Sequence, residues 1–253
     1  MLFLLVAPVT WSADGWPQLT RDNNGRWASS YPAAVPGAET VPPPTGTDNL
    51  TSLSHEWEWN HNPDTTKFRL GPGGLVLDTA TVTDDLFAAR NTLTRRVLGP
   101  RSAAVFEFDL RRMKDGDRAG AALFRDTTAY IGVHKTGADL NIVCVHGLNL
   151  TTSGWTTQSK GAVVASGPAA DAAADAVWLR ITVDVTPAFG LAPQRQAAFA
   201  YSLDGRNWTT IGRPFTMIND WRYFTGFRYA AFNFATKALG GSVTLRRFSM
   251  ELV

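Results

Sequence analysis

The amino-acid sequence predicts an all-β protein built as a two-sheet antiparallel β-sandwich. From residue 51 onward, short segments rich in β-branched and aromatic residues recur at close spacing, and turns rich in Gly and Asp separate them. The segment 178–185 alternates strictly, with Leu179, Ile181 and Val183 on one face and mainly polar side chains on the other. Such a series of short, half-buried strands is typical of a sandwich.

The individual strands are bounded by recognisable turns. The turn at 71–74 (GPGG) precedes a short apolar strand at 75–77. Nearer the C-terminus, the Asp-Gly pair at 204–205 marks the turn of a hairpin that spans 198–211. The remaining strands are expected at 103–110, 119–124, 129–133, 140–145, 178–185, 224–234 and 242–252.

Composition bounds the classes of partner. The chain has 253 residues, a net charge of +2 and 18% charged residues, which gives no electrostatic argument for nucleic acid or for a membrane surface. No apolar run approaches the roughly 20 residues that a membrane-spanning helix needs. We therefore predict neither nucleic acid nor a membrane as a partner. The single cysteine, Cys144, excludes an internal disulfide and is expected to be a small buried side chain.

The N-terminal 50 residues differ in character from the rest. Residues 1–9 (MLFLLVAPV) suit either a signal peptide or a buried strand, and the strand is favoured because no Lys or Arg precedes the short apolar run. No segment between 10 and 50 is expected to pair with it. Residues 1–27 are therefore interpreted as the tail of a domain whose body is absent. Residues 28–50 are rich in Pro, Ser and Thr and are predicted to be a linker.

No catalytic or metal-binding motif stands out in the sequence. The four histidines lack a metal-ligand spacing, and no nucleophile or nucleotide-binding string is present. A structural Ca²⁺ would suit a sandwich with Asn- and Asp-containing turns, but no spaced ligand string supports one, so no cofactor is predicted. Five aspartates fall in predicted turns, where solvated turn residues are the expected role. They are Asp84, Asp85, Asp115, Asp117 and Asp204.

A dense polar cluster is the first candidate site. Arg and Asn beside Trp side chains suit sugar hydroxyls, because guanidinium and amide groups bind them while the sugar C–H face stacks on a ring. The alternative is an ion network on the sheet, with Asp115 and Asp117 as partners, and this second interpretation is favoured. The cluster consists of Arg90, Asn91, Arg95 and Arg96.

An aromatic loop at 220–226 (DWRYFTG) is the second candidate site. Trp221, Tyr223 and Phe224 are so close in sequence that they cannot all face one core, so at least one is expected to project outward. An outward ring would serve as an interface anchor or as a platform for a sugar. The alternative is the entry of a strand that buries Trp221 and Tyr223 together.

Several of these strings, taken together, resemble the C-terminal concanavalin-A-like β-sandwich of glycoside hydrolase family 43, the β-xylosidase and α-arabinofuranosidase family. The resemblance covers about residues 50–253 and assigns 51–253 to a concanavalin-A-like jelly roll. Residues 3–17 also resemble the last strand of that family's five-bladed catalytic propeller as it leaves for the linker. The strings that carry the resemblance to the sandwich are 57–64 (WEWNHNPD), 86–96 (LFAARNTLTRR), 113–120 (MKDGDRAG), 130–133 (YIGV) and 201–205 (YSLDG).

The resemblance implies an accessory role. Family members hydrolyse xylosides and arabinosides with three acidic residues carried by the propeller, and none of these is expected in this chain, which alone should be inactive. In related enzymes a loop aromatic of the sandwich closes the sugar subsite. Tyr223 occupies the matching position here, where relatives more often have Phe. The implied partners are the catalytic propeller and a xylo- or arabino-oligosaccharide, and the substrate class favours an extracellular or periplasmic location.

Two competing hypotheses remain. A carbohydrate-binding protein that acts alone would account for the nine tryptophans and the Arg/Asn cluster. A complete, unrelated hydrolase would need two carboxyl groups facing each other across a cleft, at roughly 5–9.5 Å, and the sequence offers no sign of them.

Overall fold

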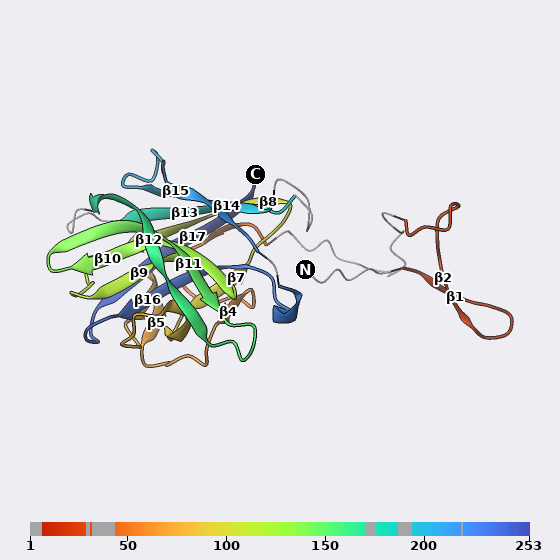
Figure 1. Ribbon diagram of the computed structural model, residues 1–253, viewed down its shortest axis with the longest axis horizontal. Coiled ribbons are helices and arrows are strands. Elements are labelled where there is room, and N and C mark those ends of the chain that lie inside the picture. Colours follow the sequence, from red (N-terminus) through yellow and green to blue (C-terminus); the bar gives the residue numbers. More distant parts are fainter. Residues whose placement is uncertain (1–6, 29–30, 32–43, 171–175, 187–193, 219) are drawn as a thin grey trace. The chain divides into compact units, whose positions relative to one another are not determined.

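The structure is a computed structural model that describes residues 7–28, 31, 44–170, 176–186, 194–218 and 220–253. The chain divides into two compact units, Met1–Pro43 and Pro44–Val253. The larger unit is a β-sandwich whose two antiparallel sheets lie face to face (Figure 1). This architecture confirms the predicted fold class. No helix in the described ranges is long and apolar enough to cross a membrane.

The first sheet has seven strands within the described residues, and all its neighbouring strands are antiparallel. One edge is the long strand β12, and the other edge is the short strand β4, which carries the Trp-Glu-Trp string. In spatial order the strands are β12 (Thr157–Ala170), β11 (Asp139–Leu150), β10 (Thr127–Thr136), β9 (Asp117–Phe124), β16 (Arg228–Ala235), β7 (Leu93–Arg96) and β4 (Trp57–Trp59).

The second sheet has eight strands in the described part of the chain. Seven of them form a continuous series, and the eighth, β3 (Gly46–Asp48), pairs with one end of β17. The series is β15 (Thr209–Thr216), β14 (Gln196–Ser202), β13 (Val177–Asp184), β8 (Arg101–Asp109), β17 (Ser242–Leu252), β6 (Gly74–Asp78) and β5 (Phe68–Gly71).

The main core fills the space between the sheets. β13 shows how the alternation predicted at 178–185 builds it, because Leu179, Ile181 and Val183 are all buried while the intervening side chains are partly exposed. Aromatic rings join the two sheets at one end: the centroids of Trp57 and Phe248 lie 4.9 Å apart in an edge-to-face arrangement.

A second apolar cluster covers the outer face of the seven-stranded sheet. It contains Tyr130, Phe232 and Phe234 from the sheet, together with Leu86 and Phe87 from a short 3₁₀ helix, η1 (Leu86–Ala88). Asp85 caps this helix, because its Oδ1 accepts a hydrogen bond from the backbone N–H of Phe87 at 2.9 Å. The chain's own side chains therefore fill part of this sheet face.

The smaller unit contains a hairpin of two three-residue strands, β1 (Val9–Trp11) and β2 (Pro17–Leu19). Val9, the last residue of the strand predicted at 1–9, pairs with Leu19, so the expectation that nothing between 10 and 50 could pair with that strand was wrong. Residues 1–6, which hold most of the predicted strand at 1–9, lie outside the described residues.

The sandwich begins earlier than the predicted linker boundary at residue 50. Strand β3 already belongs to the second sheet, and Leu50 is fully buried in the core. Pro and Ser content made this stretch look like linker, whereas its short strand contributes to the edge of a sheet. The middle of the predicted linker, 32–43, lies outside the described residues.

Candidate functional site

The aromatic loop, defined as residues 220–226, is a single turn of 3₁₀ helix, η2 (Trp221–Tyr223), at the entry to β16. Asp220 caps it by accepting a hydrogen bond from the backbone N–H of Arg222 at 2.9 Å. Phe224 then adopts a left-handed conformation (φ 56°), which ends the turn, so that β16 starts at Arg228 rather than at the predicted residue 224.

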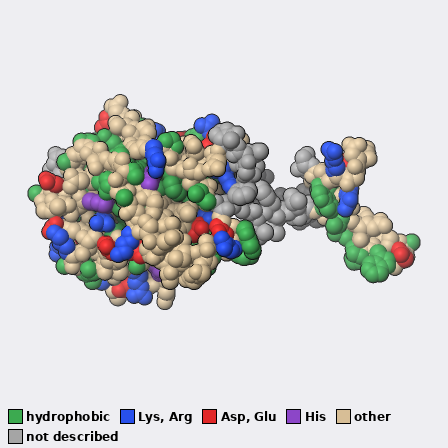
Figure 2. Space-filling model, viewed as in Figure 1, with side chains coloured by type: hydrophobic (Ala, Val, Ile, Leu, Met, Phe, Trp, Pro, Cys, Tyr) green, Lys and Arg blue, Asp and Glu red, His purple; other side chains and the backbone are tan. Residues whose placement is uncertain are grey.

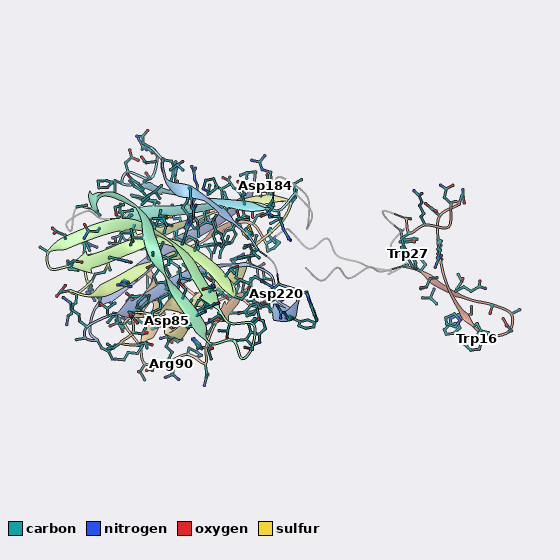
Figure 3. All side chains as sticks on the ribbon, viewed as in Figure 1. Trp16, Trp27, Asp85, Arg90, Asp184 and Asp220 are labelled. Atoms are coloured by element: carbon teal, nitrogen blue, oxygen red, sulfur yellow. The ribbon has the colours of Figure 1, made fainter. Side chains whose placement is uncertain are left out.

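Two of the three rings in the aromatic loop project into solvent. Trp221 is 76% exposed and Phe224 is 75% exposed. Tyr223 is partly buried and packs edge-to-face on Trp155, with ring centroids 5.0 Å apart. The prediction of an outward ring is confirmed, and the alternative that buries Trp221 with Tyr223 is wrong. Figure 2 shows a hydrophobic patch at the surface near the position that Figure 3 labels Asp220.

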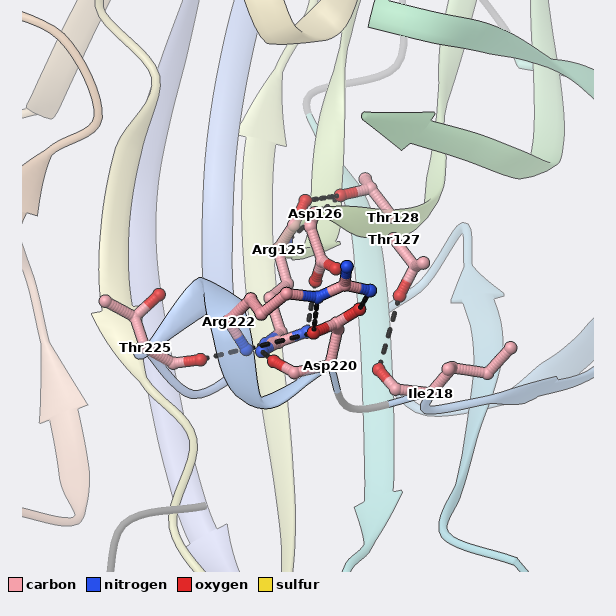
Figure 4. Close-up of polar contacts among 8 residues, drawn as sticks. All are labelled: Arg125, Asp126, Thr127, Thr128, Ile218, Asp220, Arg222 and Thr225. Carbon is pink, nitrogen blue, oxygen red and sulfur yellow. Dashed lines mark hydrogen bonds and ion pairs between the residues drawn. The ribbon is translucent and has the colours of Figure 1, made fainter. Parts of the chain in front are cut away.

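A buried arginine fastens the loop to the first sheet. Arg125 lies in the turn between β9 and β10 and is only 2% exposed. Its Nε donates a hydrogen bond to the carbonyl oxygen of Thr225 at 2.8 Å, and its Nη2 donates to that of Asp220 at 2.6 Å (Figure 4). The guanidinium also lies 4.9 Å from the ring centroid of Tyr223. One side chain therefore holds both ends of the loop and the ring at its centre.

The charge of Arg125 is compensated by Asp126, the next residue in the chain. The Nη1 of Arg125 pairs with Oδ1 of Asp126, and both side chains are buried. Burial lowers the pKa of Arg125 and raises that of Asp126, while the attraction between the two acts against both shifts. The backbone is fixed nearby, because Thr128 donates from its hydroxyl to the carbonyl of Arg125 at 2.7 Å. We call the pair Arg125 and Asp126 the clamp. These contacts make it a rigid part of the sheet.

A small pocket of about 190 Å³ lies beside the loop. Glu58 and Arg228 form an ion pair at 2.6 Å there, and this pair holds the pKa of Glu58 below its usual value. Trp59 and Tyr223 supply aromatic surface to the same pocket. The pocket is lined by Glu58, Trp59, Asn60, Thr94, Phe124, Arg125, Tyr223, Thr225, Gly226 and Arg228.

The other candidates from the polar cluster lie elsewhere. Asn91 is 1% exposed, and its amide binds the backbone of Asp64, with Oδ1 accepting from the N–H at 2.8 Å and Nδ2 donating to the carbonyl at 3.0 Å. Arg90 is exposed, and its Nε donates to the carbonyl of Asn62 at 3.0 Å. Both residues therefore fasten the turn that follows β4. Figure 3 shows Arg90 well away from Asp220, so the structure does not bring them to the aromatic loop.

The remaining arginines of that cluster form an ion network, but not with the partners predicted. Arg95 is buried and pairs with Glu56, and its guanidinium lies 5.3 Å from the ring centroid of Trp57. Arg96 pairs with Glu58 at 3.5 Å. Asp115 instead binds Lys237 at 2.6 Å. The prediction of Asp115 and Asp117 as partners was wrong, because strand pairing places β7 beside β4 and β16.

Asp117, the other predicted partner, is buried at the start of β9 and accepts a hydrogen bond from the backbone N–H of Lys114 at 2.7 Å. Burial raises its pKa. It therefore has a structural position rather than the solvated one that a turn residue was expected to have.

Cys144 and His134 have structural positions. Cys144 is fully buried as predicted, and burial raises the pKa of its thiol to about 12. His134 pairs across the strands with Asn141, and its Nε2 lies 2.9 Å from the Tyr130 hydroxyl. Within the residues that the structure describes, no three His, Cys, Asp or Glu side chains form a group that could hold a metal ion.

Sequence reasoning missed Arg125, Asp126 and Trp155. A signal for the first two was present, because a charged pair between two apolar strand segments indicates a turn with a buried contact. Trp155 follows β11 in a loop that has no pattern of its own, so its contact with Tyr223 depends on tertiary structure.

Comparison with known proteins decides the family. Residues 49–251 match the sequence model of the β-xylosidase C-terminal concanavalin-A-like domain. The chain belongs to this family. A solved family 43 glycoside hydrolase, engineered to display both endo-xylanase and exo-arabinofuranosidase activity, shares 52% identity with a TM-score of 0.93. The match covers 98% of this chain and 49% of that one.

Other relatives agree with this assignment. A β-xylosidase of Formosa agariphila is 27% identical over 273 residues, covering 96% of this chain and 42% of the relative. A putative β-xylosidase of Xylanibacter ruminicola is 28% identical over 227 residues, covering 87% of this chain and 37% of the relative. The chain thus spans less than half the length of these relatives. It is the C-terminal domain found in family 43 β-xylosidase-like enzymes, as the sequence resemblance predicted.

Proposed function

We propose that this chain acts as the accessory C-terminal β-sandwich of a family 43 glycosidase that hydrolyses xylosides or arabinosides, and that its aromatic loop forms part of the rim of that enzyme's active site. The loop with its clamp carries the proposal. Trp221 and Phe224 present exposed rings, while Arg125 fixes the backbone on which they stand. Two relatives carry the name β-xylosidase, which supports xylosides as the substrate class.

The physics of sugar recognition suits such a loop. The C–H faces of a pyranose or furanose ring are apolar and stack on aromatic side chains, and the surrounding hydroxyls need polar partners. A rim contact improves catalysis only if it holds the substrate in one geometry, which requires a rigid support. The buried pair of Arg125 and Asp126 provides that support, since neither side chain is free to move into solvent.

Three acids lie in or beside the loop, and none is free for proton transfer. Asp126 is buried in its ion pair with Arg125. Asp220 is bound by Arg222, which holds its pKa at about 2, and Glu58 is bound by Arg228. A glycosidase needs one carboxylic acid that is protonated near the working pH and one carboxylate free to act as base. The proposal therefore assigns the acid–base chemistry to a catalytic propeller that acts together with this domain.

The hairpin of the smaller unit fits the same proposal. Trp11 and Trp16 are each 70% exposed, and the hairpin has just two short strands in the described part of that unit. An isolated two-stranded hairpin is at best marginally stable, and exposed tryptophans mark a contact surface. We include in the proposal that residues 1–27 form the last strand region of the propeller, joined to the sandwich by the linker.

A chimera tests the rim role. This chain would replace the corresponding domain of the 52%-identical engineered enzyme, and kcat and KM would be measured on nitrophenyl xyloside and arabinofuranoside. Trp221→Ala and Phe224→Ala are each expected to lower kcat/KM about tenfold, which corresponds to about 1.4 kcal/mol of lost transition-state binding. Trp208→Ala is the matched control, because Trp208 stacks on Arg180 rather than standing on the loop.

The isolated chain is the second arm of this experiment. It is expected to release no nitrophenol above the rate of the buffer. Turnover by the isolated chain, or equal losses in the control and the loop variants of the chimera, would contradict the proposal.

A carbohydrate-binding protein that acts alone is the second candidate. The exposed ring of Trp221 favours it, together with Trp155, which packs on Tyr223 of the same loop. Native electrophoresis through gels that contain neutral arabinoxylan separates the two functions. Retardation of the isolated chain that is lost in Trp221→Ala would favour independent binding. An unchanged mobility would favour the accessory role.

A further inference from the structure

The outer face of the eight-stranded sheet carries a groove of about 730 Å³, which lies on other strands than those that hold the aromatic loop. We call it the arginine groove. Its volume is within the range of about 300–1,000 Å³ that is typical of small-molecule sites. The residues that line it are Arg69, Leu70, Gly71, Gly73, Gly74, Val76, Asp109, Arg111, Arg112, Ser242, Thr244 and Arg246.

The floor of the groove is a single row of cross-strand neighbours. Val76 of β6 pairs with Arg69 of β5 on one side and with Thr244 of β17 on the other, and Thr244 pairs in turn with Asp109 of β8. Side chains in one such row stand on the same face of a sheet. The short side chains of Val76 and Thr244 therefore lie between the longer charged ones, which makes the surface concave.

The glycine turn keeps one end of the groove open. Gly71 and Gly73 have no side chain to fill the space, and a Cβ atom at either would meet nothing within 4 Å. Gly74 has φ of +107°, and a Cβ there would lie 2.3 Å from the carbonyl oxygen of Leu245. The turn is thus pressed against β17 in a way that only glycine allows at this position.

The walls carry more positive than negative charge. Asp109 accepts hydrogen bonds from Nε of Arg111 at 3.0 Å and from Nη2 of Arg246 at 2.9 Å, and its pKa falls to about 2. Arg69 pairs with Asp78 at 2.8 Å. The groove therefore has four guanidinium groups, and two carboxylates, those of Asp78 and Asp109, pair with them. Arg112 is exposed, and the described residues provide no hydrogen-bond or ion-pair partner for its side chain.

We propose that the arginine groove binds the carboxylate of a sugar acid, namely a hexuronate unit of an acidic polysaccharide. Guanidinium groups bind carboxylates through two parallel hydrogen bonds. Arg112 is the first anchor, and Arg69 is the second, because its contact with Asp78 uses Nη1 and its side chain is more than half exposed. The hydroxyl of Thr244 is a donor and acceptor for sugar hydroxyls, and Val76 offers an apolar surface to the ring. The choice of a sugar among carboxylates rests on the proposed function, whereas the preference for an anion rests on the groove alone.

The groove does not favour nucleic acid. None of its lining side chains is aromatic, so it offers no surface for stacking a base. The net charge of the whole chain is only +2, without the broad excess that phosphate backbones attract. A short segment with one or two carboxylates fits the local charge better than a polyphosphate chain.

The test uses the complete chain in native gels that contain polygalacturonate or neutral arabinoxylan, with each mobility referred to a gel without polysaccharide. Retardation is expected in the acidic gel, and the double variant Arg69→Gln/Arg112→Gln is expected to weaken it about tenfold, because two charged hydrogen-bond partners are removed. The matched control is Arg206→Gln/Arg213→Gln, which removes two exposed arginines from the β14–β15 hairpin region of the same sheet.

Competition then identifies the chemistry that is recognised. Free D-glucuronate is expected to restore mobility in the acidic gel, while D-glucose and inorganic phosphate at the same concentration should not. The proposal is overturned if the acidic gel does not retard the chain, if the control variant loses as much affinity, or if phosphate competes as well as glucuronate. Because neither groove arginine belongs to the aromatic loop, the kinetics of the Trp221 and Phe224 chimeras are read independently.

Discussion

At the scale of single residues, Arg125 is the side chain on which the candidate site depends most. An arginine in a turn normally binds water. Arg125 instead binds two backbone carbonyls and one carboxylate, and it lies over one aromatic ring. A buried ion pair of this kind adds little net stability by itself, but removal of one partner leaves the other charged and unpaired.

Arg125→Met is therefore expected to lower the free energy of unfolding by about 3–5 kcal/mol, since Asp126 stays buried without its partner. Urea denaturation followed by tryptophan fluorescence measures this. Arg222→Met is the control on the same loop, because Arg222 and Asp220 form an exposed pair and little change is expected. Equal losses in the two variants would show that Arg125 does not clamp the loop.

His134 provides a second test at this scale, through pH. Burial, with a smaller contribution from Arg118, lowers the pKa of His134 from 6.5 to about 4. Between these values the unfolded chain binds a proton that the folded chain excludes, so stability should be full above about pH 6.5 and fall as the pH drops toward 4. The loss should be on the order of 2–3 kcal/mol.

The measurement is the free energy of unfolding in urea from pH 7 to pH 4. His134→Gln, which keeps a hydrogen-bonding group near the Tyr130 hydroxyl, is expected to flatten the slope in this window. A variant whose slope equals that of the wild type would assign the pH dependence to other groups, such as His146, whose pKa burial also lowers.

At the scale of elements, the strands that the sequence predicts well are those whose two faces differ. β13 alternates between core and solvent along its whole length, so its period identifies both the strand and its buried face. The elements that sequence reasoning missed are short. A 3₁₀ turn such as η2 has three residues and no period, and its position depends on the Asp220 cap and on Phe224 in the left-handed region.

Sequence reasoning has the same limit at the candidate site, because contacts between distant residues leave no local pattern. Three aromatic residues lie close together in the aromatic loop, so at least one ring must face outward. This inference needs no knowledge of the fold. Which ring is held, and by what, depends on Arg125, which is 100 residues away from Thr225 in sequence. Likewise, no sequence pattern shows that the left-handed backbone of Asn91 (φ 59°) places it in a turn, where its amide binds the backbone of Asp64.

At the scale of the whole molecule, the two units differ in how they bury apolar surface. The sandwich holds two apolar clusters, one on each face of its seven-stranded sheet. In the described part of the smaller unit, Trp11, Trp16 and Trp27 are instead exposed. Exposed rings beside short unpaired strand edges favour association between molecules.

Removal of residues 1–43 is therefore expected to reduce aggregation without lowering the thermal midpoint of the sandwich, because both sheets lie within Pro44–Val253. Light scattering at increasing protein concentration measures the first effect, and thermal unfolding by circular dichroism measures the second. Trp11→Ser/Trp16→Ser in the complete chain isolates the contribution of the hairpin and should reproduce most of the gain. If the shortened chain aggregates as readily as the complete one, the exposed tryptophans do not drive association, and the surface that does so must be sought on the sandwich, where Trp221 and Phe224 are the most exposed aromatic side chains.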